Sequence, residues 1–370
     1  MKVLVAPDVG RLEIGDVSVP AIGPTQVLVR TAVSGVSAGT EKRKLFTREL
    51  GPNDVRAPWP AIGGFGYMAA GVVEAVGAGV DHVAPGDRVY AGRTWGGHRE
   101  LIDVEGSAVI PLPEGLGWVD AACSYWAVPP LLGLLAAEPR YYDGAAVVGL
   151  GPLGLMGVQL LARQARRVVA LDPVAERRLL AVELGATAAV DPRASAATPP
   201  GVADAVRAFA PELPETVLEV SGSQPGLETA LAIVRPRGCV ALVGSQQRLD
   251  RFDLFWPLQH SGARIVPLYR EGQASVQSAA GNPTQRWLPL VHEMLQRGWL
   301  RIAPLISWIV SPEVAPRAMD LLHRRPDLAV GMAIAWDPAL VRDDEAVERA
   351  WVADTRQTPH SASPLGTIAR

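Results

Sequence analysis

A glycine-rich hexapeptide at 149–154, with the sequence GLGPLG, has the clearest capacity for chemistry in this chain. It follows a predicted strand and opens a predicted helix, whose first N–H groups and dipole favour an anion. Gly149 permits a tight turn, Gly151 lets the backbone approach a pyrophosphate, and Gly154 lets the helix pack close to the strand. Pro152 is tolerated at the start of the helix because a backbone N–H in the first turn would have no hydrogen-bond partner within the helix. We predict a dinucleotide-binding loop formed by Gly149, Gly151, Pro152, Leu153 and Gly154.

Asp172 ends the next predicted strand, at the spacing of the acid that binds the adenosine ribose hydroxyls of a dinucleotide. A carboxylate at this position repels a 2′-phosphate, which favours NAD(H) over NADP(H). The alternative is that Asp172 caps the following helix, and the basic Arg177 and Arg178 would tolerate a phosphate. We expect NAD(H) to be preferred. Arg177, Ser221 and Gly244 complete the predicted cofactor-binding residues.

The elements that would position this loop form a parallel sheet. From about residue 124 to 275, strands alternate with helix-length segments, which is typical of strands joined by helical crossovers. The count of six strands is that of a full dinucleotide-binding fold. The predicted strands are 146–148, 168–171, 188–190, 216–220, 239–243 and 264–266.

The first 120 residues read differently, as short β-rich runs such as 26–33 and 70–76 separated by turn residues. We predict a β domain over 1–123 that is completed by 300–340, a nucleotide-binding domain over 124–299, and a C-terminal tail over 341–370. Because the chain shows no basic stripe, and because its most apolar stretch, 145–162, is interrupted by glycines and a proline, we expect no nucleic-acid or membrane partner. The two cysteines give no disulfide framework and favour a cytoplasmic location. We predict the later elements to be helices at 285–296, 314–323 and 344–354 and strands at 305–310 and 329–336.

Three further segments resemble the medium-chain dehydrogenase/reductase superfamily, and the resemblance runs from about residue 24 to 336. They are the run 24–41, the run 69–89, and the turn 96–100. The resemblance implies an α/β protein with a GroES-like β-barrel catalytic domain, a Rossmann dinucleotide-binding domain, and an active site in the cleft between them. It also implies an oxidoreductase that acts on a small-molecule substrate. We expect a homodimer or a homotetramer.

Zinc members of that superfamily hold the metal with Cys, His and Cys or acidic ligands. The matching positions here are Ser37, Tyr67 and a residue near Cys123 or Ser124, which is a poor donor set for zinc. No four-cysteine zinc lobe is present. The run Gly39–Lys42 is similar to that of zinc-free, bacteriochlorophyllide dehydrogenase-like proteins. We therefore predict no metal.

Without a metal, hydrogen-bond donors must stabilise the developing oxyanion. The predicted catalytic residues are Ser37, Thr40, Glu41 and Tyr67, and Tyr67 is the most attractive proton donor. The alternative is a tyrosine that only packs in the cleft. Trp95, His98 and Trp126 are predicted to line the pocket of a bulky or aromatic substrate, although such rings also fill cores.

Three functions compete on this basis. The first is NAD(H)-dependent interconversion of a secondary alcohol and a ketone. The second is reduction of a carbon–carbon double bond, as in enoyl or quinone reductases, which usually use NADPH. The third is a cofactor-binding protein without catalysis. Asp172 favours the first.

Overall fold

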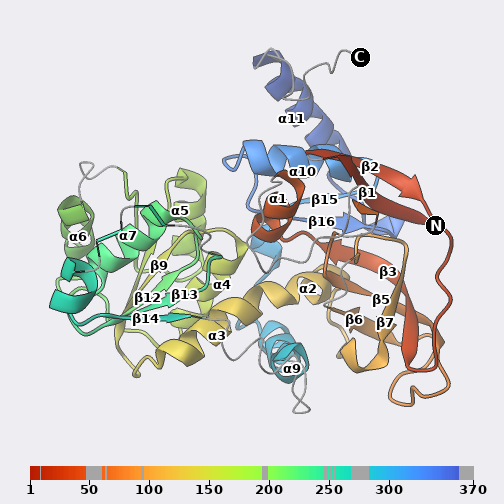
Figure 1. Ribbon diagram of the computed structural model, residues 1–370, viewed down its shortest axis with the longest axis horizontal. Helices are drawn as coiled ribbons and strands as arrows, with labels where there is room; N and C mark the ends of the chain where they lie inside the picture. Colours follow the sequence, from red (N-terminus) through yellow and green to blue (C-terminus); the bar gives the residue numbers. More distant parts are fainter. Residues whose placement is uncertain are drawn as a thin grey trace.

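The computed structural model describes residues 1–8, 10–46, 61–62, 65–92, 96–193, 199–245, 249–250, 252–253, 255–267 and 283–357. Two bodies lie side by side, one green and one red to orange with blue C-terminal strands (Figure 1). The expected α/β class with two domains is confirmed.

The first body contains a seven-stranded and a three-stranded sheet. In the larger sheet the order is β15-β16-β3-β5-β6-β8, with β7 also paired to β3, and the smaller sheet has the order β2-β1-β4. Strand β3 is buried along most of its length, including the consecutive residues Val27, Leu28 and Val29, and it pairs antiparallel with β5. The elements are β1 (Lys2–Asp8), β2 (Arg11–Asp16), β3 (Gln26–Gly35), α1 (Ala38–Phe46), β4 (Ala61–Ile62), β5 (Met68–Val76), β6 (Arg88–Ala91), β7 (Leu101–Glu105), η1 (Gly106–Ala108) and β8 (Val109–Pro111).

The second body is a six-stranded parallel sheet with the order β11-β10-β9-β12-β13-β14, the arrangement of dinucleotide-binding folds. Successive residues of β9 point into opposite apolar layers: Ala145 and Val147 join one core cluster, and Ala146 and Val148 join another. The sheet is therefore covered on both faces. Its elements are β9 (Gly144–Val148), α4 (Pro152–Leu161), β10 (Arg167–Leu171), α5 (Ala175–Glu183), β11 (Ala188–Val190), α6 (Pro199–Arg207), β12 (Thr216–Glu219), α7 (Gln224–Ile233), β13 (Cys239–Leu242), η3 (Phe255–His260) and β14 (Arg264–Pro267).

The segment between the two bodies is apolar. Residues 118–137 are long and apolar enough to cross a membrane by length and composition. In the structure they form three consecutive elements, and Ala121, Trp126 and Leu134 lie in the same core cluster as the nucleotide sheet. The segment serves as a core layer in this fold. The three elements are α2 (Trp118–Cys123), η2 (Ser124–Ala127) and α3 (Val128–Ala137).

The C-terminal part returns to the first body. Strand β16 pairs antiparallel with β3, and β15 pairs parallel with β16, so residues 306–335 complete the seven-stranded sheet. Helix α11 then packs on α10 and β15, with Val347 fully buried. The helix expected at 344–354 is thus present and slightly longer. These elements are α9 (Pro283–Gln296), η4 (Ala303–Leu305), β15 (Ile306–Val310), α10 (Ala315–Arg324), β16 (Gly331–Ala335), η5 (Pro338–Leu340) and α11 (Asp344–Gln357).

Candidate active site and dinucleotide-binding loop

The loop from β9 to α4 has the backbone shape that a dinucleotide requires. Gly149 has φ 92°, and a Cβ there would lie 2.7 Å from the backbone nitrogen of Ser221. A Cβ on Gly154 would lie 1.9 Å from the carbonyl oxygen of Gly149. A Cβ on Gly151, by contrast, would meet nothing within 4 Å. The open face of Gly151 at the start of α4 is where a pyrophosphate would approach, so the residues present fit a dinucleotide.

Asp172 lies at the carboxyl end of β10 with its side chain turned toward the loop. One carboxylate oxygen accepts from the backbone N–H of Leu150 and the other from that of Val174, each at 2.8 Å. The residue is 4% exposed. Helix α5 has Val174 as its N-cap, so Asp172 does not cap it in the usual position. The carboxylate ties the phosphate loop to the neighbouring strand, and each oxygen keeps a lone pair for a further donor.

The two arginines after Asp172 are both engaged. Arg178 donates to the carbonyl oxygen of Asp172 at 2.8 Å and lies 3.4 Å from the carboxylate of Asp191. Arg177 donates to the carbonyl oxygen of Ala329 at 3.0 Å. Burial lowers the pKa of Arg177, while Asp172 and other nearby carboxylates act against that shift. In this structure each guanidinium is bound to a backbone carbonyl oxygen and does not extend into solvent, where it could bind a 2′-phosphate.

The loops after β12 and β13 close the same edge of the sheet. Ser221 donates its hydroxyl to the buried carboxylate of Glu219, which also accepts from the N–H groups of Ser221 and Gly222. A Cβ on Gly244 would lie 2.3 Å from the nitrogen of Gly222. Sequence reasoning missed Glu219, whose signal is an acidic residue at the end of an otherwise apolar strand. It shapes the loop that carries Ser221.

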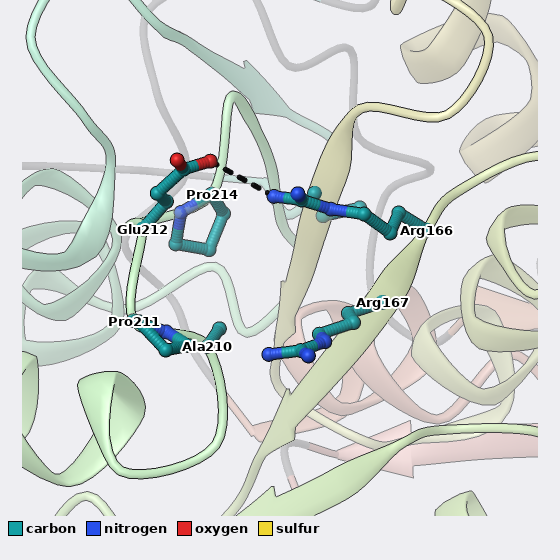
Figure 2. A pocket seen from close by; sticks show the side chains of 8 residues that line it. Arg166, Arg167, Ala210, Pro211, Glu212 and Pro214 are labelled. Atoms are coloured by element: carbon teal, nitrogen blue, oxygen red, sulfur yellow. Dashed lines mark hydrogen bonds and ion pairs between the residues drawn. The ribbon is translucent and has the colours of Figure 1, made fainter.

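A separate shallow pocket of about 190 Å³ lies at the opposite edge, beside the amino ends of β9 and β10 (Figure 2). Arg166 pairs there with Glu212 at 2.9 Å, and Arg167 donates to the carbonyl oxygen of Phe209. Ligands of open α/β sheets bind at the carboxyl ends of the strands, so we do not place the active site in this pocket.

Three hydroxyl groups meet where α1 begins. Tyr67, just before β5, donates its hydroxyl to Ser37 Oγ at 2.6 Å and is hydrogen-bonded to the side chain of Thr40. Burial raises the pKa of the Tyr67 phenol well above its usual value, while Ser37 and Thr40 act in the opposite direction. The ring of Tyr125 packs edge-on against that of Tyr67, with centroids 5.6 Å apart. A phenol in this setting stays protonated at neutral pH.

A buried polar chain supports the hydroxyl cluster. Glu41 Oε1 accepts from the backbone N–H of Ser37 at 2.9 Å, and Glu41 Oε2 lies 3.1 Å from His98 Nε2. His98 Nδ1 lies 2.8 Å from Ser34 Oγ, which accepts from Trp336 Nε1 at 2.9 Å. The side chains of Glu41 and His98 have no exposed surface. Three segments of the chain, represented by residues 34–41, His98 and Trp336, therefore meet behind Ser37.

The donors in this chain can be assigned from the network. Because Trp336 can only donate, Ser34 accepts from it and its own hydroxyl proton can point to His98 Nδ1. That leaves the proton of the imidazole on Nε2, where it donates to Glu41. With this assignment every member is satisfied, which holds Glu41 and the backbone of Ser37 in one geometry.

The rings predicted to line the substrate pocket have other places. His98 is buried behind the hydroxyl cluster, where Gly66, with φ 79°, leaves room for its ring. Trp126 is 1% exposed, and a Cβ on Gly331 would lie 2.8 Å from its ring. Both rings thus lack a free face here, in agreement with the alternative that they fill the core. Trp95 lies outside the described residues.

The residues at the expected zinc positions do not fit zinc. Tyr67 and Ser37 bond to each other, and Ser124 donates its hydroxyl to the carbonyl oxygen of Ala121 at 2.7 Å. Burial, with Asp120 nearby, raises the pKa of the Cys123 thiol, which disfavours the thiolate that binds metals. In the described part of the chain, no three His, Cys, Asp or Glu residues are grouped to hold a metal.

Ser34, Tyr125 and Trp336 were missed by sequence reasoning. Ser34 stands in the quoted run 24–41, but nothing in that run shows that it would meet Trp336 from 302 positions away. Trp336 ends the last strand expected in the catalytic domain, and this position was the one feature of the sequence that could have placed it near the site.

Two family models match the chain. The alcohol dehydrogenase GroES-like domain matches residues 23–125, and the zinc-binding dehydrogenase model matches residues 152–280. Among curated relatives, the zinc-type alcohol dehydrogenase-like protein YphC of Escherichia coli is 27% identical over 303 residues, or 72% of this chain and 84% of that protein. Sorbitol dehydrogenase of Rattus norvegicus is 23% identical over 370 residues, or 90% and 96%.

Solved structures share the fold. Alcohol dehydrogenase TADH from Thermus sp. ATN1 superposes with a TM-score of 0.74 at 23% identity, over 90% of this chain and 99% of that chain. Galactitol-1-phosphate dehydrogenase from Escherichia coli superposes with a TM-score of 0.76 at 21% identity, over 90% and 100%. The two-domain architecture inferred from the motifs is thereby confirmed.

Proposed function

Because the chain belongs to the medium-chain dehydrogenase/reductase superfamily of oxidoreductases, we propose that it interconverts a secondary alcohol and a ketone with NAD(H) and without zinc. The observation that carries the proposal is the hydroxyl cluster of Tyr67, Ser37 and Thr40 at the expected metal position. A partly buried, protonated phenol can donate a hydrogen bond to a carbonyl oxygen and so polarise the carbonyl group, which is the role of the metal ion in zinc enzymes.

A dinucleotide held by the loop 149–154 and Asp172 would supply the hydride that the carbonyl carbon accepts. When a ketone is bound, the Tyr67 hydroxyl turns from Ser37 Oγ to the carbonyl oxygen and donates its proton there, so that the alcohol leaves neutral. The phenolate that remains accepts hydrogen bonds from Ser37 and Thr40, and it lies beside the first turn of α1, where the helix dipole favours negative charge. Thr40 is half-buried and so connects Tyr67 with solvent for reprotonation. Tyr67 is protonated at neutral pH, which is the state that reduction of a carbonyl requires.

We propose NAD(H) as the preferred cofactor because Asp172 is at the predicted ribose position, and both neighbouring arginines already donate to backbone carbonyl oxygens. Like charges at short range would weaken binding of a 2′-phosphate. Fluorescence titration should show tighter binding of NADH than of NADPH, and Asp172→Ser should narrow or reverse the preference. Equal affinities in the unmodified protein would contradict this assignment.

Two observations bear on the substrate class. Relatives named sorbitol dehydrogenase and putative D-xylulose reductase suggest polyols, whereas ten tryptophans in the chain suggest a bulky or aromatic ketone. NADH oxidation should be followed with aliphatic ketones, ketoses, aromatic ketones, enones and quinones. Turnover of ketones supports the proposal, while turnover restricted to enones or quinones would make the protein a double-bond or quinone reductase.

Zinc independence has its own test. Elemental analysis should find no stoichiometric zinc, and a chelator should leave carbonyl reduction unchanged, because Ser37 and Tyr67 replace two ligand types. One zinc per chain with activity lost on its removal would overturn this part of the proposal.

A further inference from the structure

Arg177 crosses from one domain to the other at the ribose end of the site. It stands on α5, beside the nucleotide sheet, and its Nη2 donates to the carbonyl oxygen of Ala329, between α10 and β16. Its Nε is buried without a hydrogen-bond partner among the described residues. The guanidinium lies within the fields of Asp172 on its own domain and of Asp327 on the other. A cation shared by two domains in this way depends on the position of both.

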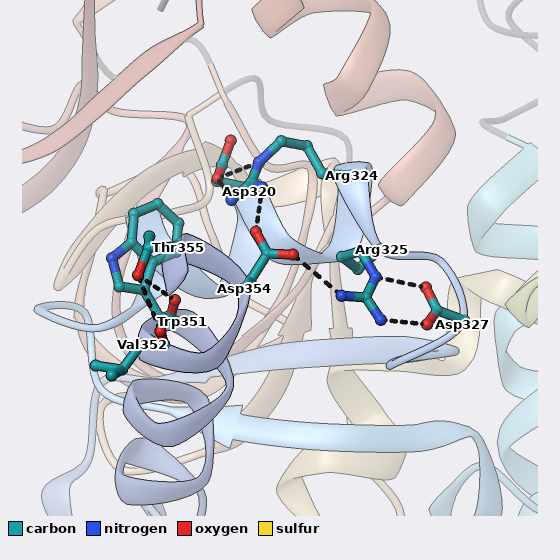
Figure 3. A network of polar contacts seen from close by, with 8 residues as sticks. All are labelled: Asp320, Arg324, Arg325, Asp327, Trp351, Val352, Asp354 and Thr355. Atoms are coloured by element: carbon teal, nitrogen blue, oxygen red, sulfur yellow. Dashed lines mark hydrogen bonds and ion pairs between the residues drawn. The ribbon is translucent and has the colours of Figure 1, made fainter. Parts of the chain in front are cut away.

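The loop that receives Arg177 is fastened by the C-terminal helix α11 (Figure 3). Arg325 donates through Nε and Nη2 to the two carboxylate oxygens of Asp327 at 3.0 and 2.6 Å. Its Nη1 donates to Asp354 of α11 at 3.1 Å, and the other oxygen of Asp354 accepts from Arg324. Asp354 is 4% exposed, so it is fixed between two arginines. The position of the loop thus depends on a carboxylate that α11 supplies.

We propose that α11 sets the affinity for the dinucleotide from the opposite domain, by fixing the loop 325–329 that holds Arg177 near Asp172. The inference rests on the proposed role of Asp172 as the acceptor of the ribose hydroxyls. Arg177 and Asp354 are positioning residues in this arrangement. If the loop shifts, Arg177 loses its acceptor on Ala329, and the positive charge beside the ribose acceptor moves with it. Couplings carried by such networks change affinity by about twofold to thirtyfold.

A double-mutant cycle on NADH affinity tests the coupling, and it needs no substrate. NADH is titrated by fluorescence into the unmodified protein, Arg177→Met, Asp354→Asn and the double variant. We expect each single variant to bind NADH about fivefold more weakly. The double variant should bind no more weakly than Arg177→Met alone, because Asp354 acts through Arg177. The inference would be overturned if the loss of NADH affinity in the double variant equalled the product of the losses in the two single variants. It would also be overturned if Asp354→Asn left the affinity unchanged.

Glu348→Gln is the matched control. Glu348 also joins α11 to α10, through an ion pair with Arg317, but it does not reach Arg325. This variant should lower the melting temperature without changing NADH affinity, and an equal loss of affinity would show general loosening and overturn the coupling. Asp327→Asn, at a more exposed position, replaces Asp354→Asn in the cycle if the latter does not fold, with the same expected result.

The outcomes separate this inference from the proposed function. A protein that binds no NADH would overturn both. NADH binding with multiplicative losses would overturn only the coupling. A completed cycle with no effect of Asp172→Ser on cofactor choice would support the coupling and contradict the assigned cofactor preference.

Discussion

The two ends of the candidate active site are built by different means. The dinucleotide end is made of backbone: three glycines within six residues shape the loop, and a single carboxylate, Asp172, braces it. The hydroxyl end is made of side chains from four distant segments, with Trp336 reaching Ser34 across 302 positions. The dinucleotide loop depends on the absence of Cβ atoms at its glycines, whereas the hydroxyl end depends on each hydrogen-bond partner in a network of side chains. The two ends should therefore respond differently to substitution and to pH.

The sharpest separation of the two ends is expected from Tyr67→Phe. The change removes one donor and keeps the ring against Tyr125. Loss of a preorganised donor lowers turnover by about 10²–10³-fold, while NADH affinity should stay unchanged. Carbonyl reduction and NADH titration measure the two effects. Near-normal turnover would move the proton donor to Thr40 or a water, and Tyr125→Phe serves as a control expected to alter turnover little.

Acid should destabilise the hydroxyl end through His323. Burial lowers its pKa to about 4, with Glu41 acting against the shift. The folded protein keeps this histidine neutral, so between about pH 6.5 and 4 the unfolded chain binds a proton that the folded chain excludes. Stability is complete above that range and falls by about 3 kcal/mol as pH drops through it.

Urea unfolding at pH 7 and at pH 4.5 measures this loss. His323→Gln should make the free energy of unfolding less dependent on pH. His260→Gln, at an exposed position on η3, should leave the dependence as it is. An unmodified protein equally stable at both pH values would contradict the prediction.

Two glycine substitutions break the dinucleotide end in different ways. A side chain on Gly151 meets no protein atom, so Gly151→Val should keep the melting temperature and weaken NADH binding about tenfold or more. Gly154→Ala forces a Cβ toward the carbonyl oxygen of Gly149 and should lower the melting temperature as well. Thermal unfolding with NADH titration distinguishes them. Unchanged NADH affinity in Gly151→Val would mean that the pyrophosphate lies elsewhere.

The smallest effect is expected at His98, which touches Glu41 and not the hydroxyl cluster itself. His98→Gln keeps a donor toward Glu41 and loses the bond to Ser34. We expect kcat to fall about threefold to tenfold with KM little changed, because the geometry of Ser37 relaxes without losing a substrate contact. His98→Phe, which removes both bonds, should lower kcat further. Equal activity of all three proteins would reduce His98 to a packing role.

The contrast also explains what could be predicted from the sequence. The loop at 149–154, the acid at 172 and the six strands were predicted because strand, turn and glycine spacing are local properties. Tyr67 and Ser37 were proposed together because the resemblance places both at metal-ligand positions, and the structure brings them within hydrogen-bond distance. The inward turn of His98 and the bond of Ser34 to Trp336 depend on how β3, β5 and β16 pair, which no local pattern contains. Burial of Trp126 likewise depends on Gly331, far along the chain.

The return of the last strands to the first sheet has a consequence for synthesis on the ribosome. Strands β9 to β14 come from one continuous stretch, 144–267, so the nucleotide sheet can close as soon as that stretch has emerged. The sheet around β3 must wait for β16, and Ser34 must wait for Trp336. The first domain to be translated is thus the last to be completed, and the end of β3 that pairs with β16, Val33–Gly35, lacks that partner while the second domain folds. We therefore expect chaperones to bind the nascent N-terminal segment during translation.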